Sequence, residues 1–320
     1  PGMLLTLVLG ALAALVVFRQ LTIWEAGILA AILAPTDAGL GQIIVSSPRV
    51  PLKIREALNV EAGLNDGLSV PFLLFFIALA GSEISGGSEA SLHKFIWEQL
   101  GYGAIVGAGI GLVGGWLLGR ADRNRTVAPA WSQLGVVMLP LLCLVASEKV
   151  GASMFIAAFV GGLAVQVFFK QAGKHAIEFT EEWGQILNLS VFFLFGMIVA
   201  RALPQLTAAH WIYAALSLTV IRMLPVAVAL LGTGLSRATV VFMGWFGPRG
   251  LASIVLALVY LVHHAENPGE NTIRLAAIAT VLLSIFLHGL TARPGIDLYA
   301  KAVAKLAPSA PEREGCERPA

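Results

Sequence analysis

Residues 23–46 read IWEAGILAAILAPTDAGLGQIIVS, an apolar run that is interrupted in its middle by Pro35-Thr36-Asp37-Ala38-Gly39. Proline removes a backbone donor and strains the turn before it, so carbonyl groups near Pro35 become free to face a cavity. Residues 238–262 form a second apolar run, interrupted by Gly247-Pro248-Arg249-Gly250. The two stretches predict a pair of discontinuous helices in an apolar environment.

The composition identifies that environment as a membrane. Of the 320 residues, 57% are hydrophobic and only 12% are charged, against the ~25% charged residues of a soluble domain. The mean hydropathy is +0.82. The charges lie in short strips between apolar runs of roughly 16 to 25 residues, the length that a helix needs to cross the hydrocarbon core. This pattern excludes a soluble enzyme, a secreted disulfide scaffold and a nucleic-acid-binding protein.

Ten apolar segments predict an all-α, polytopic transmembrane bundle of about ten helices. One domain, residues 1–294, contains all of them. Residues 295–320 are expected to form a largely disordered cytoplasmic tail, because few apolar residues follow Lys305. The ten segments are residues 3–18, 23–46, 54–79, 97–119, 131–149, 151–169, 184–200, 208–231, 238–262 and 272–290.

Lysine and arginine give the orientation of the bundle. When the loops are assigned alternately to the two sides, fourteen of the 21 Lys and Arg residues fall on one side and five on the other. An excess of positive charge marks the cytoplasmic side. The sequence therefore predicts a multi-pass protein of the cell (inner or plasma) membrane with a cytoplasmic C-terminal tail.

A glycine recurs every four residues along the segment 97–119, at positions 103, 107, 111, 115 and 119. This spacing places a smooth stripe on one helix face and lets another backbone approach closely. We expect packing within the chain, with dimerisation as the alternative.

Five ionisable residues lie inside the apolar helices, where each costs ~2.5 to 3.5 kcal/mol on the mildest insertion scale. Counted from the cytoplasmic helix ends, all five lie roughly 10 to 18 Å deep. A structural ion pair is the simplest explanation for any one of them. Three carboxylates against two guanidiniums, however, leave one carboxylate that needs a mobile cation or a proton. The five are Asp37, Glu61, Asp66, Arg222 and Arg249.

The two broken helices run in opposite directions in this orientation. Such a pair meeting at the midplane indicates the ion site of an inverted-repeat secondary transporter. On the third segment, Glu61, Asn65 and Ser69 share one helix face, with Asp66 about 100° round from Asn65. A carboxylate such as Asp66 offers a hard oxygen to Na⁺ or Li⁺, and the same oxygen accepts a proton.

These residues, in this order and at these separations, resemble a known family. The chain is similar to the bacterial sodium/proton antiporters of the first monovalent cation:proton antiporter family, the NhaP-like branch related to the eukaryotic sodium/hydrogen exchangers. The resemblance covers the chain up to about Tyr299. The motifs are residues 34–37 (APTD), 61–67 (EAGLNDG), 222–225 (RMLP), 247–250 (GPRG) and 287–294 (LHGLTARP).

The resemblance implies that the chain exchanges a monovalent cation, Na⁺ and possibly Li⁺, for H⁺, and that Asp66 is the carboxylate for which both ions compete. It implies Na⁺ ligation at Asp66 and Thr36, with Asn65 as a partner of Asp66 and Asp37 beside them at the helix crossing. Asparagine before the aspartate goes with electroneutral exchange in this family.

The resemblance also implies structural roles. Glu61 and Arg222 correspond to a buried stabilising pair, and Arg249 to a second core arginine. Members are usually homodimers in which a six-helix core bundle moves like an elevator against a dimerisation domain. No cofactor is implied besides the transported ions, and the partners are those ions, the lipid bilayer and a second copy of the chain.

Two departures from the family pattern affect these expectations. Ala62 stands where relatives often have serine, which removes one possible hydroxyl ligand. The early helices of the family are also missing, so we expect the chain to be truncated at its N-terminus by two or three helices.

Three alternatives remain open at this point. A potassium/proton antiporter or potassium-efflux system of the same superfamily would use a similar site, and a channel-like or sensory module would carry an inactive one. An intramembrane hydrolase is disfavoured because no histidine has the HExxH spacing. The histidines are His93, His175, His210, His263, His264 and His288.

Overall fold

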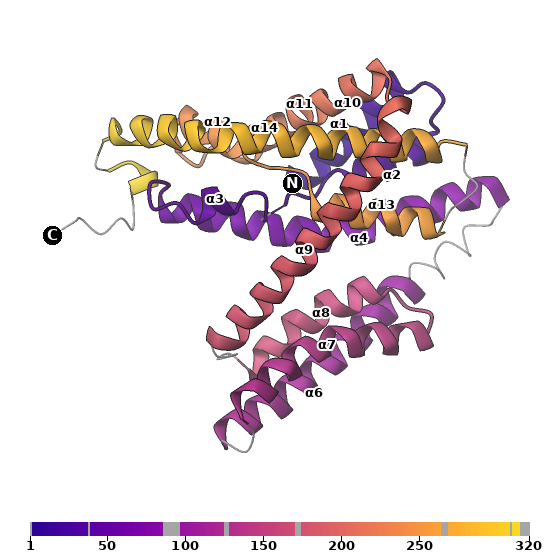
Figure 1. Cartoon of the computed structure of the whole chain (residues 1–320), viewed down its shortest axis with the longest axis vertical. Coiled ribbons are helices and arrows are strands. Elements are labelled where there is room, and N and C mark those ends of the chain that lie inside the picture. Colours follow the sequence, from indigo (N-terminus) through magenta and orange to yellow (C-terminus); the bar gives the residue numbers. More distant parts are fainter. Residues whose placement is uncertain are drawn as a thin grey trace. The chain divides into compact units, whose positions relative to one another are not determined.

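The computed structural model describes residues 2–37, 39–85, 97–124, 128–169, 174–263, 268–307 and 309–313. All regular secondary structure in these residues is helical (Figure 1), as the sequence predicted. The chain divides into two compact units. One consists of Pro1–Ile77 and Phe195–Ala320, and the other of Ala78–Leu194.

The first unit contains both interrupted helices. The first apolar run forms α2 (Ile23–Ile32) and α3 (Gln42–Val45), and the second forms α12 (Arg237–Trp245) and α13 (Leu251–His263). The predicted breaks therefore lie between α2 and α3 and between α12 and α13. The other helices of this unit are α1 (Gly2–Val17), the first part of α4 (Leu52–Ser85), the last part of α9 (Lys174–Ala202), the 3₁₀ turn η2 (Leu203–Gln205), α10 (Ala208–Leu218), α11 (Val220–Ala229) and α14 (Glu270–Ala304).

A third interruption was not predicted. The segment expected as one helix at 208–231 divides at Thr219, whose backbone lies at φ −109°, ψ −92°. The Thr219 hydroxyl donates to the Ala215 carbonyl 2.6 Å away. A threonine that bonds back to the preceding turn can bend a helix, and the Thr219 backbone leaves the helical region at the junction of α10 and α11.

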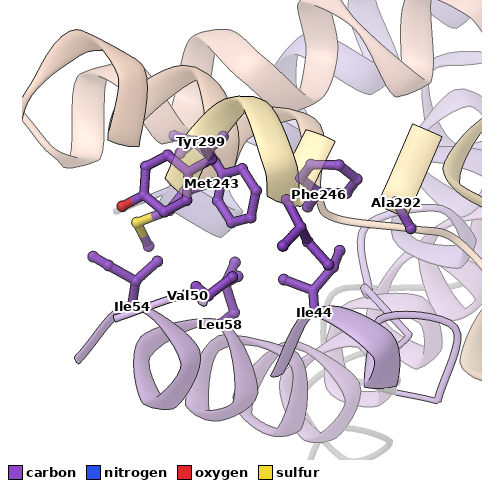
Figure 2. Packing of buried hydrophobic residues seen from close by; sticks show 11 residues of the cluster. Ile44, Val50, Ile54, Leu58, Met243, Phe246, Ala292 and Tyr299 are labelled. Atoms are coloured by element: carbon purple, nitrogen blue, oxygen red, sulfur yellow. The ribbon is translucent and has the colours of Figure 1, made fainter. Parts of the chain in front are cut away.

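A hydrophobic cluster packs several helices of the first unit together (Figure 2). It joins α3, the start of α4, α11, α12 and α14, and Phe242 stacks on Tyr299 with ring centroids 4.0 Å apart. The members are Ile44, Val50, Ile54, Leu58, Val226, Phe242, Met243, Phe246, Ala292, Ile296 and Tyr299.

Part of the segment that was expected to be a disordered tail is ordered among the described residues. α14 continues to Ala304, ten residues past the expected domain boundary at 294, and the 3₁₀ turn η3 (Pro311–Arg313) follows. Glu312 is buried and accepts hydrogen bonds from Ser236 N (2.7 Å) and Thr239 Oγ1 (2.8 Å) at the start of α12. Burial alone would raise the pKa of Glu312, but these hydrogen bonds outweigh it and hold the pKa below its usual value.

Residues of the polar tail are thus ordered because they bind the ends of other helices. The first amides of a helix need acceptors, and its last carbonyls need donors. Glu312 supplies the first for α12. Arg313 supplies the second for α14 by donating to the carbonyls of Val303 (3.0 Å) and Ala304 (2.8 Å). Residues 314–320 of the expected disordered tail lie outside the described residues.

The second unit contains the glycine stripe. Besides the end of α4 and the start of α9, its helices are the π-helical η1 (Trp97–Tyr102), α6 (Gly103–Arg123), α7 (Pro129–Lys149) and α8 (Met154–Phe168), with α6, α7 and α8 side by side (Figure 1). A Cβ atom on Gly107 would lie 2.1 Å from the Ala157 carbonyl oxygen of α8, and one on Gly111 2.3 Å from that of Gly161. The stripe therefore serves packing within the chain.

Replacing Gly107 by alanine is expected to destabilise the protein by about 1 to 3 kcal/mol, because the added methyl group would overlap a backbone atom that cannot yield. The matched control is Gly109→Ala on the same helix, whose Cβ would meet nothing within 4 Å. Melting temperatures of the purified protein in detergent measure both. Equal melting temperatures for the two variants would contradict the packing of α6 on α8.

Among the described residues, six helices are long and apolar enough to cross a membrane: Leu52–Gly81, Gly103–Arg123, Trp131–Lys149, Gly184–Gln205, Ala208–Ala229 and Glu270–Ala304. Shorter apolar helices of 10 to 17 residues cover Gly2–Val17, Ile23–Ile32, Ile156–Phe168 and Leu251–Val262. Every predicted segment thus has a helical counterpart, and the count of ten spans stays a prediction.

Candidate functional site

Asp37 joins the two broken helices where they cross. Its backbone amide donates to the Pro248 carbonyl (2.7 Å), and its Oδ2 accepts from the Leu251 amide (2.7 Å), the first residue of α13. Its Oδ1 accepts from the amides of Gly39 (2.7 Å) and Leu40 (3.3 Å). A carboxylate at a helix N-terminus satisfies free amides and interacts favourably with the helix dipole. Both oxygens of Asp37 are thus bound to backbone amides.

Two glycines of the second break leave the space that these contacts need. A Cβ atom on Gly250 would lie 2.0 Å from Asp37 Oδ2, and one on Gly247 would lie 2.3 Å from Arg222 Nε. The motif Gly247-Pro248-Arg249-Gly250 therefore lets the chain pass between a carboxylate and a guanidinium group.

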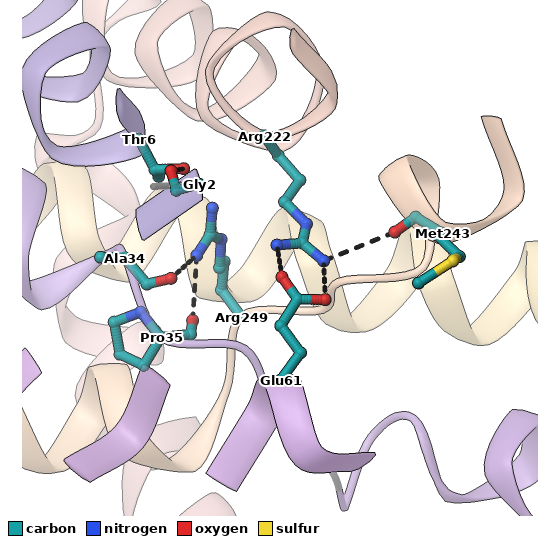
Figure 3. A network of polar contacts seen from close by, with 8 residues as sticks. All are labelled: Gly2, Thr6, Ala34, Pro35, Glu61, Arg222, Met243 and Arg249. Atoms are coloured by element: carbon teal, nitrogen blue, oxygen red, sulfur yellow. Dashed lines mark hydrogen bonds and ion pairs between the residues drawn. The ribbon is translucent and has the colours of Figure 1, made fainter. Parts of the chain in front are cut away.

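Arg249 occupies the crossing from the other side and is fully buried. Its Nη1 donates to the carbonyl of Ala34 and to that of Pro35 at 3.0 Å (Figure 3). These carbonyls follow the end of α2, where the helix can no longer supply donors. Its Nε and Nη2 have no hydrogen-bond partner among the described residues.

Arg222 and Glu61 form the buried ion pair that the resemblance implied. Both terminal nitrogens of Arg222 donate to the carboxylate of Glu61, Nη2 at 2.9 Å, and Nη2 also lies 3.4 Å from the Met243 carbonyl (Figure 3). The Arg222 side chain is 4% exposed and that of Glu61 28% exposed. Two parallel bonds to one carboxylate give the strong bidentate form of this interaction.

Asp66 is the carboxylate that remains. Its Oδ1 is buried and has no hydrogen-bond partner among the described residues. The nearby carboxylate of Asp37 repels it. Asp37 is held by amides and Glu61 by Arg222, so among the described residues Asp66 is the one of these three carboxylates with a buried oxygen that has no hydrogen-bond partner.

Two cavities lie next to the ion pair. One of about 20 Å³ is lined by Thr36, Asp37, Glu61 and Arg222, together with Phe246 and Pro248. That volume holds about one water molecule or one small ion.

A larger cavity of about 330 Å³ shares Glu61 and Arg222 with the smaller one and has Asn65 on its wall. Asp66 is not among the residues that line either cavity. The structure therefore places Thr36 and Asn65 on different cavities, joined by the Glu61–Arg222 pair.

A row of polar residues lies on α14. Sequence reasoning included His288 and Thr291 in the motif 287–294 without giving them a role, and it did not single out Ser284. Ser284 Oγ accepts from the Arg249 amide (2.7 Å), and His288 Nε2 lies 2.9 Å from the Trp245 carbonyl. The indole nitrogen of Trp245 donates to Thr291 Oγ1 (3.0 Å). Their spacing of four and three residues inside an apolar helix was the available signal.

Comparison with known proteins gives a family and several relatives. The family model described as "Sodium/hydrogen exchanger, transmembrane" matches residues 1–296. The "K(+)/H(+) antiporter NhaP2" of Shewanella sp. (strain MR-4) is 25% identical over 275 residues, which cover 83% of this chain and 46% of the relative. The "Na(+)/H(+) antiporter 2" of Zygosaccharomyces rouxii is 26% identical over 296 residues, 82% of this chain and 36% of the relative. The chain spans about half the length of the curated relatives that it matches, or less.

A solved structure shares the fold. "Structure of the sodium proton antiporter MjNhaP1 from Methanocaldococcus jannaschii at pH 8" superimposes with a TM-score of 0.66 at 21% sequence identity. The match covers 90% of this chain and 76% of the other.

Proposed function

The chain belongs to the transmembrane sodium/hydrogen exchanger family, and from this premise we propose that the full-length protein exchanges a monovalent cation for H⁺ across a membrane. The observation that supports this is the buried Oδ1 of Asp66, which has no hydrogen-bond partner in the part of the chain that the structure describes. A buried carboxylate without a permanent partner is stable only when a proton or a cation neutralises it. A cation/proton exchanger needs a carboxylate of this kind, whereas a purely structural ion pair requires no carboxylate without a permanent partner.

The other two carboxylates of the site are bound to protein groups, so we assign the exchange of ions to Asp66. Glu61 is bound to Arg222, and Asp37 accepts three backbone amides, so neither is free to alternate between two ions. In our proposal Asp37 therefore shapes the crossing and is not a direct ligand. The cation binds Asp66 with oxygen from Thr36, while Asn65 orients the site without adding charge.

The transported cation is proposed to be Na⁺, with Li⁺ as a second substrate. Asn65-Asp66 favours the sodium-type branch of the resemblance stated above. K⁺ is the second candidate, because the relatives carry both the K⁺/H⁺ and the Na⁺/H⁺ names. One cation for one proton at one carboxylate makes the exchange electroneutral.

The proposed setting rests on the family resemblance and on the distribution of Lys and Arg residues. The protein is a transporter and not an enzyme, it lies in the cell membrane as a multi-pass protein, and its C-terminal end faces the cytoplasm. It acts as a homodimer and binds no nucleic acid.

Competition at one group makes a kinetic prediction. When the pH falls, protons occupy Asp66 more often, so the apparent Km for the cation should rise while Vmax changes little. When most Asp66 side chains carry a proton, the apparent Km rises by about tenfold for each unit of pH decrease, because each unit increases the proton concentration tenfold. The measurement is the dissipation of ΔpH in everted vesicles with Na⁺, Li⁺ and K⁺ in turn, across pH 5.5 to 8.5.

The full-length protein is compared with empty vesicles. No cation-dependent proton movement would refute the exchange function. A Km that does not depend on pH, or exchange that generates a membrane potential, would show that a second titrating group carries the proton.

A further inference from the structure

The break between α12 and α13 needs hydrogen-bond partners. The last carbonyls of α12 and the first amides of α13 have none within their own helices. Inside a membrane each unsatisfied backbone group costs several kcal/mol. Asp37 satisfies the break from the side of α2 and α3, by binding the amide of Leu251.

α14 satisfies the break from the other side. Ser284, His288 and Thr291 lie at positions i, i+4 and i+7, on one face of that helix. Ser284 is fully buried and His288 is 3% exposed. Ser284 binds the Arg249 amide, whereas His288 and Thr291 bind the backbone carbonyl and the indole of Trp245, the last residue of α12.

The partners of His288 determine which ring nitrogen carries the hydrogen. A carbonyl oxygen only accepts, so Nε2 is the donor to Trp245. Nδ1 lies 3.1 Å from Ser284 Oγ and 2.9 Å from the Ser284 carbonyl. In the neutral ring Nδ1 accepts from the hydroxyl, and in the doubly protonated ring it donates to the carbonyl. The bond from Nε2 to Trp245 persists in both states.

Phe246 links the contact between His288 and Trp245 to the candidate site. The imidazole of His288 lies edge-on to the Phe246 ring, with centroids 6.4 Å apart. Phe246 and Pro248 line the small cavity together with Thr36. A donor that fixes the end of α12 at Trp245 therefore also fixes the part of the cavity wall that Phe246 forms.

We propose that His288, supported by Ser284, is a positioning residue for cation binding, which acts by holding the last carbonyl of α12 and so sets the geometry of the α12–α13 break. The role rests on the proposed exchange function, because it concerns the same site. His288 touches no transported ion. The donor at Nε2 is what matters, and the charge of the ring is not required.

The test compares His288→Ala with His288→Gln in the full-length protein, since glutamine places an amide donor at a similar reach and cannot titrate. The control is Thr280→Val on the same helix, which removes a buried hydroxyl bonded to the carbonyl of Ala276 within α14. For His288→Ala we expect the Km for Na⁺ to rise about tenfold per folded protein, since the Trp245 carbonyl loses its side-chain donor and keeps the Gly247 amide (2.9 Å). We expect His288→Gln to restore the Km and Thr280→Val to leave it unchanged.

Amide hydrogen exchange of residues 246–251 gives a readout that needs no transport. It should accelerate in His288→Ala and stay at the wild-type level in His288→Gln. A wild-type protein that moves no ions would refute the proposed function, while the exchange rates would still test the contact. An unchanged Km in an active His288→Ala protein, or a His288→Gln protein as impaired as His288→Ala, would overturn the positioning role.

Discussion

Asp66→Asn is expected to abolish cation-dependent proton movement while the protein stays folded. The amide has nearly the shape of the carboxylate but carries no charge and does not exchange a proton in this pH range. Since Asp37 and Glu61 are both engaged, no other carboxylate of the site takes over. Proton flux in vesicles measures the effect, and substantial Na⁺-dependent flux in the folded variant would contradict the role of Asp66.

Stability supplies the second readout for this variant. Asp66 Oδ1 is buried without a partner among the described residues, and Asp37 repels it, so removing its charge should leave the melting temperature unchanged or higher. A ligand at about 100 times its Kd stabilises a protein by ~2.7 kcal/mol. Saturating Na⁺ should therefore stabilise the wild type, and the asparagine variant should not respond.

Glu61→Ala is expected to destabilise the protein by about 3 to 5 kcal/mol, because it leaves the buried Arg222 guanidinium without its carboxylate. The remaining Arg222 would also repel Arg249, which Glu61 attracts in the intact site. Arg222→Ala should cost less, since the Glu61 side chain is 28% exposed and keeps its attraction to Arg249. Melting temperatures in detergent measure both.

Two further variants, an exposed control and a double substitution, test this prediction. Glu56→Ala removes an exposed glutamate of the same helix and should change stability by no more than about 0.5 kcal/mol. The double variant Glu61→Leu with Arg222→Met leaves no stranded charge and should be more stable than Glu61→Ala alone. If the double variant were as unstable as the sum of the single ones, the two residues would not act as a pair.

Much of the fold was predictable because the membrane imposes a simple rule on sequence. Apolar runs must be helical to satisfy their own backbone, so each predicted apolar segment corresponds to helix in the part of the chain that the structure describes. Proline and glycine inside two such runs located both discontinuous helices. Thr219 was missed because a threonine inside an apolar run carries no comparable signal, and its bond to Ala215 depends on local geometry.

The expected tail shows the limit of composition. Few apolar residues after Lys305 predicted disorder, yet Glu312 and Arg313 bind the ends of α12 and α14. A single charged residue can order a segment when a helix terminus lies within reach, and sequence does not reveal which terminus that is.

The sequence by itself determined the ingredients of the site: five charges at one depth, two broken helices and one more carboxylate than the arginines can balance. Only the tertiary structure decided how the charges are distributed. Asp37 binds amides of α13 and of its own loop, Glu61 binds Arg222, and Arg249 binds the carbonyls of Ala34 and Pro35. Asp66 keeps a buried oxygen that has no partner among the residues the structure describes. The reason is physical, since depth and charge follow from spacing along one helix, whereas hydrogen-bond partners depend on which helix ends meet across the fold.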